Sequence, residues 1–229
     1  LAAHSLPPSQ EKLQAARQRL AFDEIFFLQI GVLRQRRTWQ AETWRPFEAG
    51  DAWLAEQLAR LPFSLTAAQQ RALDDIRRDL GTGQPMNRLL QGDVGSGKTV
   101  VAALAAAIVT ASGAQAAVMA PTSILAAQHL TKFNAILGGE GGLLQPAQIR
   151  LLLGDTPEKE RQEIRLGLAS GQVRILIGTH ALLEDPVTFA DLQFIVVDEQ
   201  HRFGVEQRAV LRSKGTNPHL LVMTATPIP

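Results

Sequence analysis

The sequence contains no cysteine, no long apolar segment and almost no net charge. The absence of cysteine excludes disulfides and thiolate zinc sites, and it fits a reducing compartment such as the cytoplasm. The longest apolar run, Val100–Ala111, includes Thr110 and falls short of the roughly 18 residues that a membrane helix needs. The first residues also lack the basic-then-apolar order of a signal peptide. We therefore expect a cytoplasmic protein that does not enter a membrane.

Positive and negative residues are balanced, with 23 Lys and Arg against 22 Asp and Glu. Any nucleic-acid surface must therefore come from a local cluster of basic residues. The composition, 45% hydrophobic and 20% charged, is typical of a folded chain, and 229 residues favour one α/β domain with an appendage. The chain starts at Leu1 without a methionine and stops at Pro229 directly after an apolar run. We expect it to be part of a longer protein.

Residues 1–60 are predicted to form a helical linker segment. Leu13, Leu20 and Phe27 recur at seven-residue spacing, which predicts one long helix, and a second short helix is expected from Trp53 to Leu61. The arginines and tryptophans between these helices either pack against the next domain or bind nucleic acid at a fork. This group consists of Arg34, Arg36, Arg37, Trp39 and Trp44.

Residues 61–229 show short apolar runs alternating with helical stretches. Continuous apolar runs of this length are typical of strands that are buried on both faces. The pattern therefore predicts an α/β domain with a mainly parallel sheet and helices on both of its faces. The six runs are Leu89–Leu90, Ala117–Ala120, Ile149–Leu153, Val173–Ile177, Phe194–Val197 and Leu220–Met223.

A phosphate-binding loop follows the first of these runs, where GDVGSGKT fits the pattern G-x-x-x-x-G-K-[ST] between a strand and a helix. Glycines let the backbone N–H groups of such a loop turn toward phosphate oxygens, and the helix N-terminus adds partial positive charge. Lys98 is expected to reach the β- and γ-phosphates, and the Thr99 hydroxyl is expected to bind Mg²⁺. The predicted nucleotide-binding residues of the loop are Gly92, Asp93, Val94, Gly95, Ser96, Gly97, Lys98 and Thr99.

Two acidic residues, Asp198 and Glu199, follow the apolar run Phe194–Val197. At the carboxyl end of a strand near the loop, Asp198 would hold Mg²⁺ through water, and Glu199 would orient the water that attacks the γ-phosphate. With Lys98, these acids are the predicted catalytic residues. The nearest match to a guanine-reading loop, 131–134, lacks the aspartate that would bind the base, so GTP is disfavoured.

Five segments resemble motifs of superfamily 2 helicases, in the order of that family. Asp198–His201 resembles the DExH box, and Thr224–Thr226 resembles the motif that links the ATP site to nucleic acid. Leu65–Gln69 resembles the adenine-reading segment, while Ala120–Thr122 and Gly178–His180 resemble two DNA contacts at strand ends. The resemblance implies that Gln69 binds adenine, that Gln200, His201, Thr224, Ala225 and Thr226 couple hydrolysis to DNA, and that Pro121, Thr122, Thr179 and His180 bind DNA.

Several of these residues also have simpler interpretations. Gln69 can be an ordinary helix residue, and Phe63 either stacks on the base or packs in the core. Thr122, Thr179 and His180 either bind phosphates or cap the helices that follow them. A basic group after the DExH box is either a DNA-facing surface or solvated charge, and it consists of Arg202, Arg208 and Arg212 with Phe203.

The strings GDVGSGKT, GTHALL, DEQHRFG and MTATPIP together resemble the RecG family, whose members are ATP-dependent helicases that remodel branched DNA in recombination and repair. The resemblance implies that residues 61–229 are a RecA-like P-loop NTPase domain, the first of two motor domains, with ATP and Mg²⁺ as cofactors. It also implies a second RecA-like domain and an N-terminal wedge domain in the same parent chain, a monomer, and a bacterial, nucleoid-associated location. This chain alone is expected to show little or no turnover.

Other functions stay open at this point. Transcription-repair coupling translocases share most of these strings but usually carry an acid at Gln200 and a bulkier residue at Ser96, and Ser123 stands where the helicase pattern has an acid. A metabolic P-loop kinase would need an acceptor pocket with an Arg-rich lid, for which no segment is found. A non-catalytic nucleotide-binding module would not depend on Glu199.

Overall fold

The computed structural model describes residues 10–40, 45–139, 141–184, 186–199 and 205–225. The chain divides into two compact units, residues 1–43 and 44–229. The first unit contains the long helix α1 (Gln10–Gln40), as the seven-residue spacing predicts. Within it, Arg19 Nε donates to Asp23 Oδ2 at 3.2 Å, and the rings of Phe22 and Phe26 stack at 5.7 Å. None of the described helices is long and apolar enough to cross a bilayer.

The second unit is built on a six-stranded sheet in the order β1-β6-β5-β2-β4-β3. Every strand pair is parallel, so all strands end at the same edge. Each of the six predicted apolar runs contributes one strand, and the predicted parallel sheet is confirmed. The strands are β1 (Asn87–Gln91), β2 (Gln115–Met119), β3 (Ile149–Leu152), β4 (Ile175–Gly178), β5 (Leu192–Asp198) and β6 (His219–Thr224).

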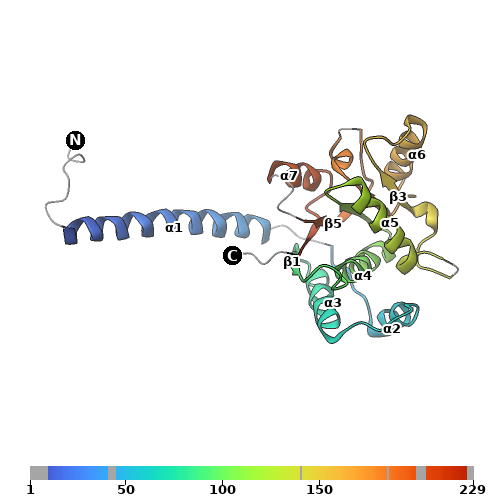
Figure 1. Ribbon diagram of the computed structural model, residues 1–229, viewed down its shortest axis with the longest axis horizontal. Helices are drawn as coiled ribbons and strands as arrows, with labels where there is room; N and C mark the ends of the chain where they lie inside the picture. The colour runs from blue at the N-terminus through green and yellow to red at the C-terminus, as the bar shows by residue number, and fades with distance from the viewer. Residues whose placement is uncertain (1–9, 41–44, 140, 185, 200–204, 226–229) are drawn as a thin grey trace. The chain divides into compact units, whose positions relative to one another are not determined.

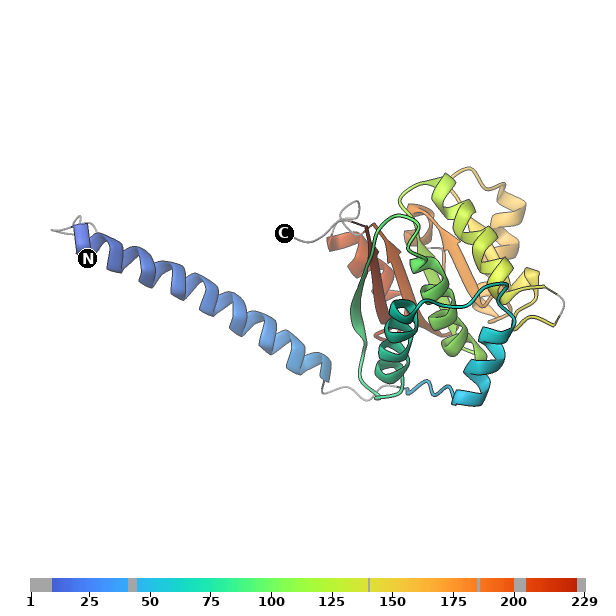
Figure 2. The same cartoon turned by 60° about the horizontal axis from the view of Figure 1, so that its bottom comes forward.

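Helices cover both faces of this sheet, as predicted (Figure 1, Figure 2). Successive residues of a strand point to opposite faces. Val118 accordingly packs in the core cluster of α2 to α5, and Met119 packs in the cluster of α6, η2 and α7. The helices are α2 (Asp51–Ala59), α3 (Ala67–Leu80), α4 (Lys98–Ala111), α5 (Ser123–Leu137), α6 (Glu158–Ala169) and α7 (Val205–Ser213), with 3-10 turns η1 (Pro146–Gln148) and η2 (His180–Leu183).

Helix α4 is apolar on all sides because it is enclosed on all sides. Every residue from Val100 to Thr110 is buried. The one hydroxyl in this stretch, on Thr110, donates to the carbonyl oxygen of Ala106 at 2.8 Å and is thereby satisfied. A helix that is hydrophobic all round suits the centre of a large core as well as a membrane, and here it is the core.

Residues 45–60, which the sequence pattern places in the linker, belong to the second compact unit. Phe47 is 1% exposed, and its backbone N–H donates to the carbonyl oxygen of Leu80 at 2.9 Å. Leu54 of α2 is buried in the same core cluster. Trp44 and the side chains of Arg36, Arg37 and Trp39 lie outside the described residues, so the two interpretations of that group both stand as predictions.

Candidate nucleotide-binding site

The strand order brings the two halves of the predicted site together. Strand β6 pairs with β1 on one side and with β5 on the other, so that Gln91 lies opposite Thr224 and Asp198 lies opposite Met223. Neighbouring strands are roughly 4.8 Å apart, which places the loop after β1 and the acid at the end of β5 on the order of 10 Å apart. The end of β6 lies between them. The backbone N–H of Gly92 donates to the carbonyl oxygen of Thr224 at 3.2 Å.

A cavity of about 510 Å³ opens at this edge of the sheet. The predicted catalytic residues Lys98, Asp198 and Glu199 all line it, and Thr99 lines it beside them. The loop and the acids therefore face one space that is large enough for a nucleotide. The other predicted residues in its wall are Gln69, Val94, Gly95, Gly97 and Ala225.

The glycines of the loop allow its backbone to fold as it does. Gly95 and Gly97 both have φ +83°, in the left-handed region that other residues avoid. A Cβ on Gly97 would also collide with the amide nitrogen of Gln69. Gly97 is the N-cap of α4 and provides no side-chain acceptor, so the first N–H groups of α4 have no side-chain cap. Unsatisfied N–H groups at a helix N-terminus are suited to bind an anion such as phosphate.

The Lys98 ammonium group lies over the loop itself. Its Nζ donates to the carbonyl oxygens of Gly92 at 2.6 Å and Asp93 at 2.9 Å. The carbonyl oxygens of the loop thus hold the Lys98 ammonium group close to the backbone N–H groups of the same loop. Val94 at the tip is 90% exposed, whereas Lys98 and Thr99 are half-buried, so the charged and hydroxyl groups are the sheltered part of the loop.

Gln69 connects helix α3 to the phosphate loop, a contact that the sequence does not reveal. Its Oε1 accepts from Thr66 N at 2.8 Å, completing a capping box at the start of α3. Its Nε2 donates to the carbonyl oxygen of Ser96 at 2.8 Å. An amide can accept two hydrogen bonds and donate two, so these two bonds use half of the hydrogen-bonding capacity of the Gln69 side chain. Phe63 lines the same cavity and is 50% exposed, which is not the burial that a core position requires.

Asp198 has a partner that sequence reasoning missed, His129 of α5. His129 Nε2 and Asp198 Oδ2 are 2.8 Å apart, and both residues are buried. His129 belongs to the buried stripe of α5, which also contains Ala126, Phe133 and Leu137. The sequence signal for this contact was a histidine at helical spacing within an apolar stripe. Such a histidine is expected to be buried, and a buried polar side chain needs a hydrogen-bond partner.

Glu199 has φ 55°, an uncommon value for a residue other than glycine. Its backbone N–H donates to the carbonyl oxygen of Met223 at 2.9 Å, which ties it to the end of β6. Its side chain lines the cavity beside Asp198. Left-handed backbone at a non-glycine residue costs free energy, and strained residues of this kind cluster at functional sites.

The predicted magnesium ligands are Thr99 and Asp198. Their hydroxyl and carboxylate oxygens are the donors that Mg²⁺ prefers, and both line the nucleotide cavity. Within the described parts of the chain there is no cluster of three or more His, Cys, Asp or Glu side chains that could hold a metal. This donor set fits a cation that is bound mainly through phosphate and water, as Mg²⁺ is in nucleotide sites.

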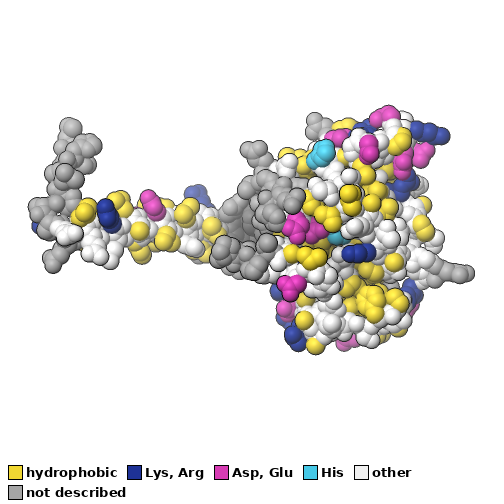
Figure 3. All heavy atoms as spheres, viewed as in Figure 1, with side chains coloured by type: hydrophobic (Ala, Val, Ile, Leu, Met, Phe, Trp, Pro, Cys, Tyr) yellow, Lys and Arg dark blue, Asp and Glu magenta, His cyan; other side chains and the backbone are white. Residues whose placement is uncertain are grey.

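The predicted DNA contacts lie at the carboxyl ends of β2 and β4. Thr122 is exposed and also caps α5, since its Oγ1 accepts from Leu125 N at 3.3 Å. Pro121 is half-buried, Thr179 is 7% exposed, and His180 is exposed at the start of η2. On the face in view in Figure 3, acidic and basic side chains of the second unit are interspersed.

The coupling residues are described only in part. Thr224 ends β6, and Ala225 lines the cavity. Gln200, His201 and Thr226 lie outside the described residues, as do Arg202, Phe203 and the side chain of Arg208. Arg212 of α7 is half-buried, and burial lowers its pKa from the ordinary value.

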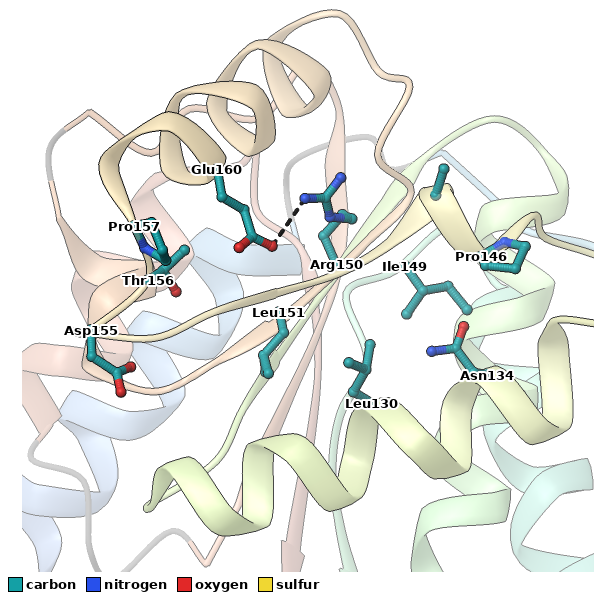
Figure 4. A pocket seen from close by; sticks show the side chains of 11 residues that line it. Leu130, Asn134, Pro146, Ile149, Arg150, Leu151, Asp155, Thr156, Pro157 and Glu160 are labelled. Carbon is teal, nitrogen blue, oxygen red and sulfur yellow. Dashed lines mark hydrogen bonds and ion pairs between the residues drawn. The ribbon is translucent and has the colours of Figure 1, made fainter.

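A second hollow, of about 600 Å³, lies away from these residues, between α5, β3 and α6 (Figure 4). Arg150 and Glu160 form an ion pair across it, with Arg150 Nη2 3.2 Å from Glu160 Oε1. None of the predicted site residues lines it.

Comparison with known proteins agrees with this geometry. The family model described as DEAD/DEAH box helicase matches residues 66–229. A curated ATP-dependent DNA helicase RecG from Synechocystis is 47% identical over 224 residues, which cover 97% of this chain and 26% of that protein. The corresponding protein of Mycobacterium tuberculosis is also 47% identical, over 100% of this chain and 32% of the relative. The chain thus spans about a quarter to a third of the length of these relatives.

One solved structure is similar over nearly the whole chain. It shows RecG bound to a three-way DNA junction, and it matches with a TM-score of 0.80 and 42% sequence identity. The match covers 98% of this chain and 29% of the other. A DNA- and AMPPNP-bound structure of the helicase MrfA matches at 22% identity with a TM-score of 0.59, which shows the shared fold.

Proposed function

This chain belongs to the DEAD/DEAH box helicase family, and on that premise we propose that it is the first, ATP-binding motor domain of a DNA helicase that acts on branched DNA. One observation carries the proposal: Lys98, at the start of α4 after the loop that follows β1, and Asp198, at the end of β5, line the same cavity. A loop and an acid in this arrangement are the two parts that nucleotide hydrolysis requires.

In the proposed reaction, the N–H groups at the start of α4 and the Lys98 ammonium bind the β- and γ-phosphates. Thr99 and Asp198 would hold Mg²⁺, which neutralises charge on the phosphate oxygens when it is bound. Glu199 orients the attacking water and accepts its proton. Gln69 binds the adenine edge with its remaining acceptor and N–H, and Phe63 stacks on the base.

Hydrolysis is proposed to reach DNA through the end of β6. Thr224 accepts a hydrogen bond from Gly92 in the phosphate loop, and the neighbouring Met223 accepts one from Glu199. A change in either half of the site therefore acts on the same two residues of β6. Ala225 and Thr226 follow directly, and with Gln200 and His201 they would pass the change to DNA bound at Pro121, Thr122, Thr179 and His180.

Branched DNA is proposed as the substrate because the relatives that match nearly the whole chain are RecG helicases, one of them bound to a three-way junction. A transcription-repair coupling translocase is not favoured by these matches. The parent protein would also contain a second RecA-like domain and an N-terminal wedge domain, and we propose that it works as a monomer in the bacterial cytoplasm, near the nucleoid. Without those domains, this chain is expected to bind nucleotide with little turnover.

The test is ATPase activity of the full-length parent protein with forked, duplex and single-stranded DNA. Forked DNA should stimulate hydrolysis most. Lys98→Ala should weaken ATP binding, whereas Glu199→Gln should preserve binding and lower kcat by at least about 100-fold, the scale expected for loss of a general base. Thr131→Val, on the exposed side of α5, is the matched control and should change neither.

Other results would point to other functions. An ATPase rate that none of the three DNAs increases would contradict the helicase proposal. Phosphate transfer to a small molecule would indicate a kinase, and full activity of Glu199→Gln would indicate a non-catalytic nucleotide-binding module.

A further inference from the structure

Helix α5 connects a predicted DNA contact to the predicted magnesium ligand. Thr122 caps its N-terminus, and His129, two turns further on, is hydrogen-bonded to Asp198. We infer that His129 is a positioning residue, which holds Asp198 in place and makes the position of that carboxylate depend on the position of α5. The inference rests on the proposed function, because it assigns a role to a residue in the wall of the same cavity.

The contact between the two side chains is short and shielded from water. Nε2 of His129 lies 2.8 Å from Oδ2 of Asp198, and the side chains are 6% and 13% exposed. The bond joins Nε2 to one carboxylate oxygen, and an ionised carboxylate can accept from an N–H group at that position. The bond engages one oxygen, which fixes the carboxylate while its other oxygen remains available as an acceptor.

The environment of His129 suggests that the ring is there for Asp198. Its other nitrogen, Nδ1, is buried and has no hydrogen-bond partner within the described part of the chain. The ring of Phe133 lies at 6.5 Å in an edge-on arrangement, and His129 itself lines the candidate nucleotide cavity. Burying an imidazole with one nitrogen unsatisfied costs free energy, and leucine would fill the stripe without that cost. The bond to Asp198 is the feature that offsets it.

Helix α5 can carry a displacement from its N-terminus to this bond. His129 is seven positions after Thr122, a distance of about 10 Å along a helix, over which helical hydrogen bonds keep the backbone stiff. Ala126 lies between them on the buried face, and Phe133 anchors the following turn. Phosphate contact at the exposed Thr122 would thus move His129 with it. The carboxylate of Asp198 would follow the ring of His129, because β5 fixes the backbone of Asp198 but not its side chain.

The experiment uses the full-length parent protein with three substitutions at this position. His129→Gln places an amide N–H near the position of Nε2 and should preserve the bond. His129→Asn is too short to reach Asp198 but remains polar, and His129→Leu fills the volume without a donor. Thr131→Val on the exposed side of α5 is again the control.

The first readout is binding of a fluorescent non-hydrolysable ATP analogue as Mg²⁺ is titrated in the absence of DNA. His129→Asn and His129→Leu should need about 10-fold more Mg²⁺ for half-maximal binding, the usual scale when a residue that orients a metal ligand is lost. Their affinity for the analogue in EDTA should match the wild type, as should the Mg²⁺ dependence of His129→Gln. In an Asp198→Asn background, the His129 substitutions should have no further effect.

The second readout is the ratio of ATPase kcat with forked DNA to kcat without DNA. If α5 transmits DNA contact to Asp198, this ratio falls in the Asn and Leu variants and stays near the wild-type value in the Gln variant. Equal Mg²⁺ dependence of wild type and His129→Asn would overturn the inference, as would an effect that persists beside Asp198→Asn. If His129→Leu does not fold, His129→Asn decides. A wild-type protein that binds no Mg²⁺-nucleotide would instead count against the proposed function.

Discussion

The buried histidine at the start of β6 should make the stability of this domain depend on pH. His219 is 0% exposed, its Nδ1 accepts from the backbone N–H of Met86 at 3.0 Å, and its ring meets the edge of Phe47 at 5.7 Å. Burial lowers its pKa from 6.5 to about 4, against a weaker opposing effect of Asp79. The native state therefore holds this imidazole neutral at a pH at which the unfolded chain protonates it.

The sign and size of the effect follow from the difference in proton binding. Above pH 6.5 both states are neutral at this position and the full stability is present. Between pH 6.5 and about 4 the unfolded state binds the extra proton, so the free energy of unfolding falls as the pH falls. The shift of 2.5 pH units corresponds to about 3 kcal/mol, at about 1.4 kcal/mol per unit. Below pH 4 this contribution is constant.

The assay is urea unfolding of this chain, followed by circular dichroism at intervals from pH 7.5 to pH 4. His219→Asn removes the titrating group and keeps an acceptor in the place of Nδ1. The free energy of unfolding of this variant should therefore fall by about 3 kcal/mol less over this range than that of the wild type. His180→Asn, an exposed histidine, should behave as the wild type. Titration of the carboxylates should change the free energy of unfolding equally in all three proteins. Parallel curves for wild type and His219→Asn would refute the assignment.

Three further predictions concern the nucleotide cavity and the core. Gly97→Ala should weaken ATP binding about 10-fold in calorimetry, because φ +83° costs a residue with a Cβ about 1–2 kcal/mol; an unchanged affinity would show that the loop does not need this backbone. Phe63→Ala should weaken binding about 5-fold and Phe63→Trp should not, if the ring adds about 1 kcal/mol by stacking; equal loss in both would point to shape instead. Gln115→Leu should lower the free energy of unfolding by about 2–4 kcal/mol, because this 0% exposed side chain makes three hydrogen bonds to backbone groups that would be left buried. A loss below about 0.5 kcal/mol in urea unfolding would contradict that account.

Much of the fold and the phosphate loop could be predicted from the sequence, because the signals are local. The glycines at 95 and 97 dictate a backbone that only glycine adopts easily, and the adjacent Lys98 and Thr99 carry the chemistry. The six apolar runs mark strands by composition alone, and each became a strand. The start of α3 was also visible, since Thr66 and Gln69 stand at capping-box spacing.

That residues 45–60 belong to the compact domain could not be predicted in this way. Their place depends on Phe47 and Leu54 packing against a core whose other members are remote in the sequence. A short helix with two buried side chains has the same local pattern whether it docks or stays in a linker. The boundary was therefore decided by tertiary packing.

The sequence by itself determined that a nucleotide loop, two acids and a parallel sheet are present, because each depends on neighbouring residues. Only the tertiary structure decided that β6 lies between β1 and β5, and that His129 reaches Asp198 across 69 positions of the chain. The physical reason is that strands buried on both faces are alike in composition, so their order is set by how the helices pack over the sheet. The contacts behind the site follow from that order.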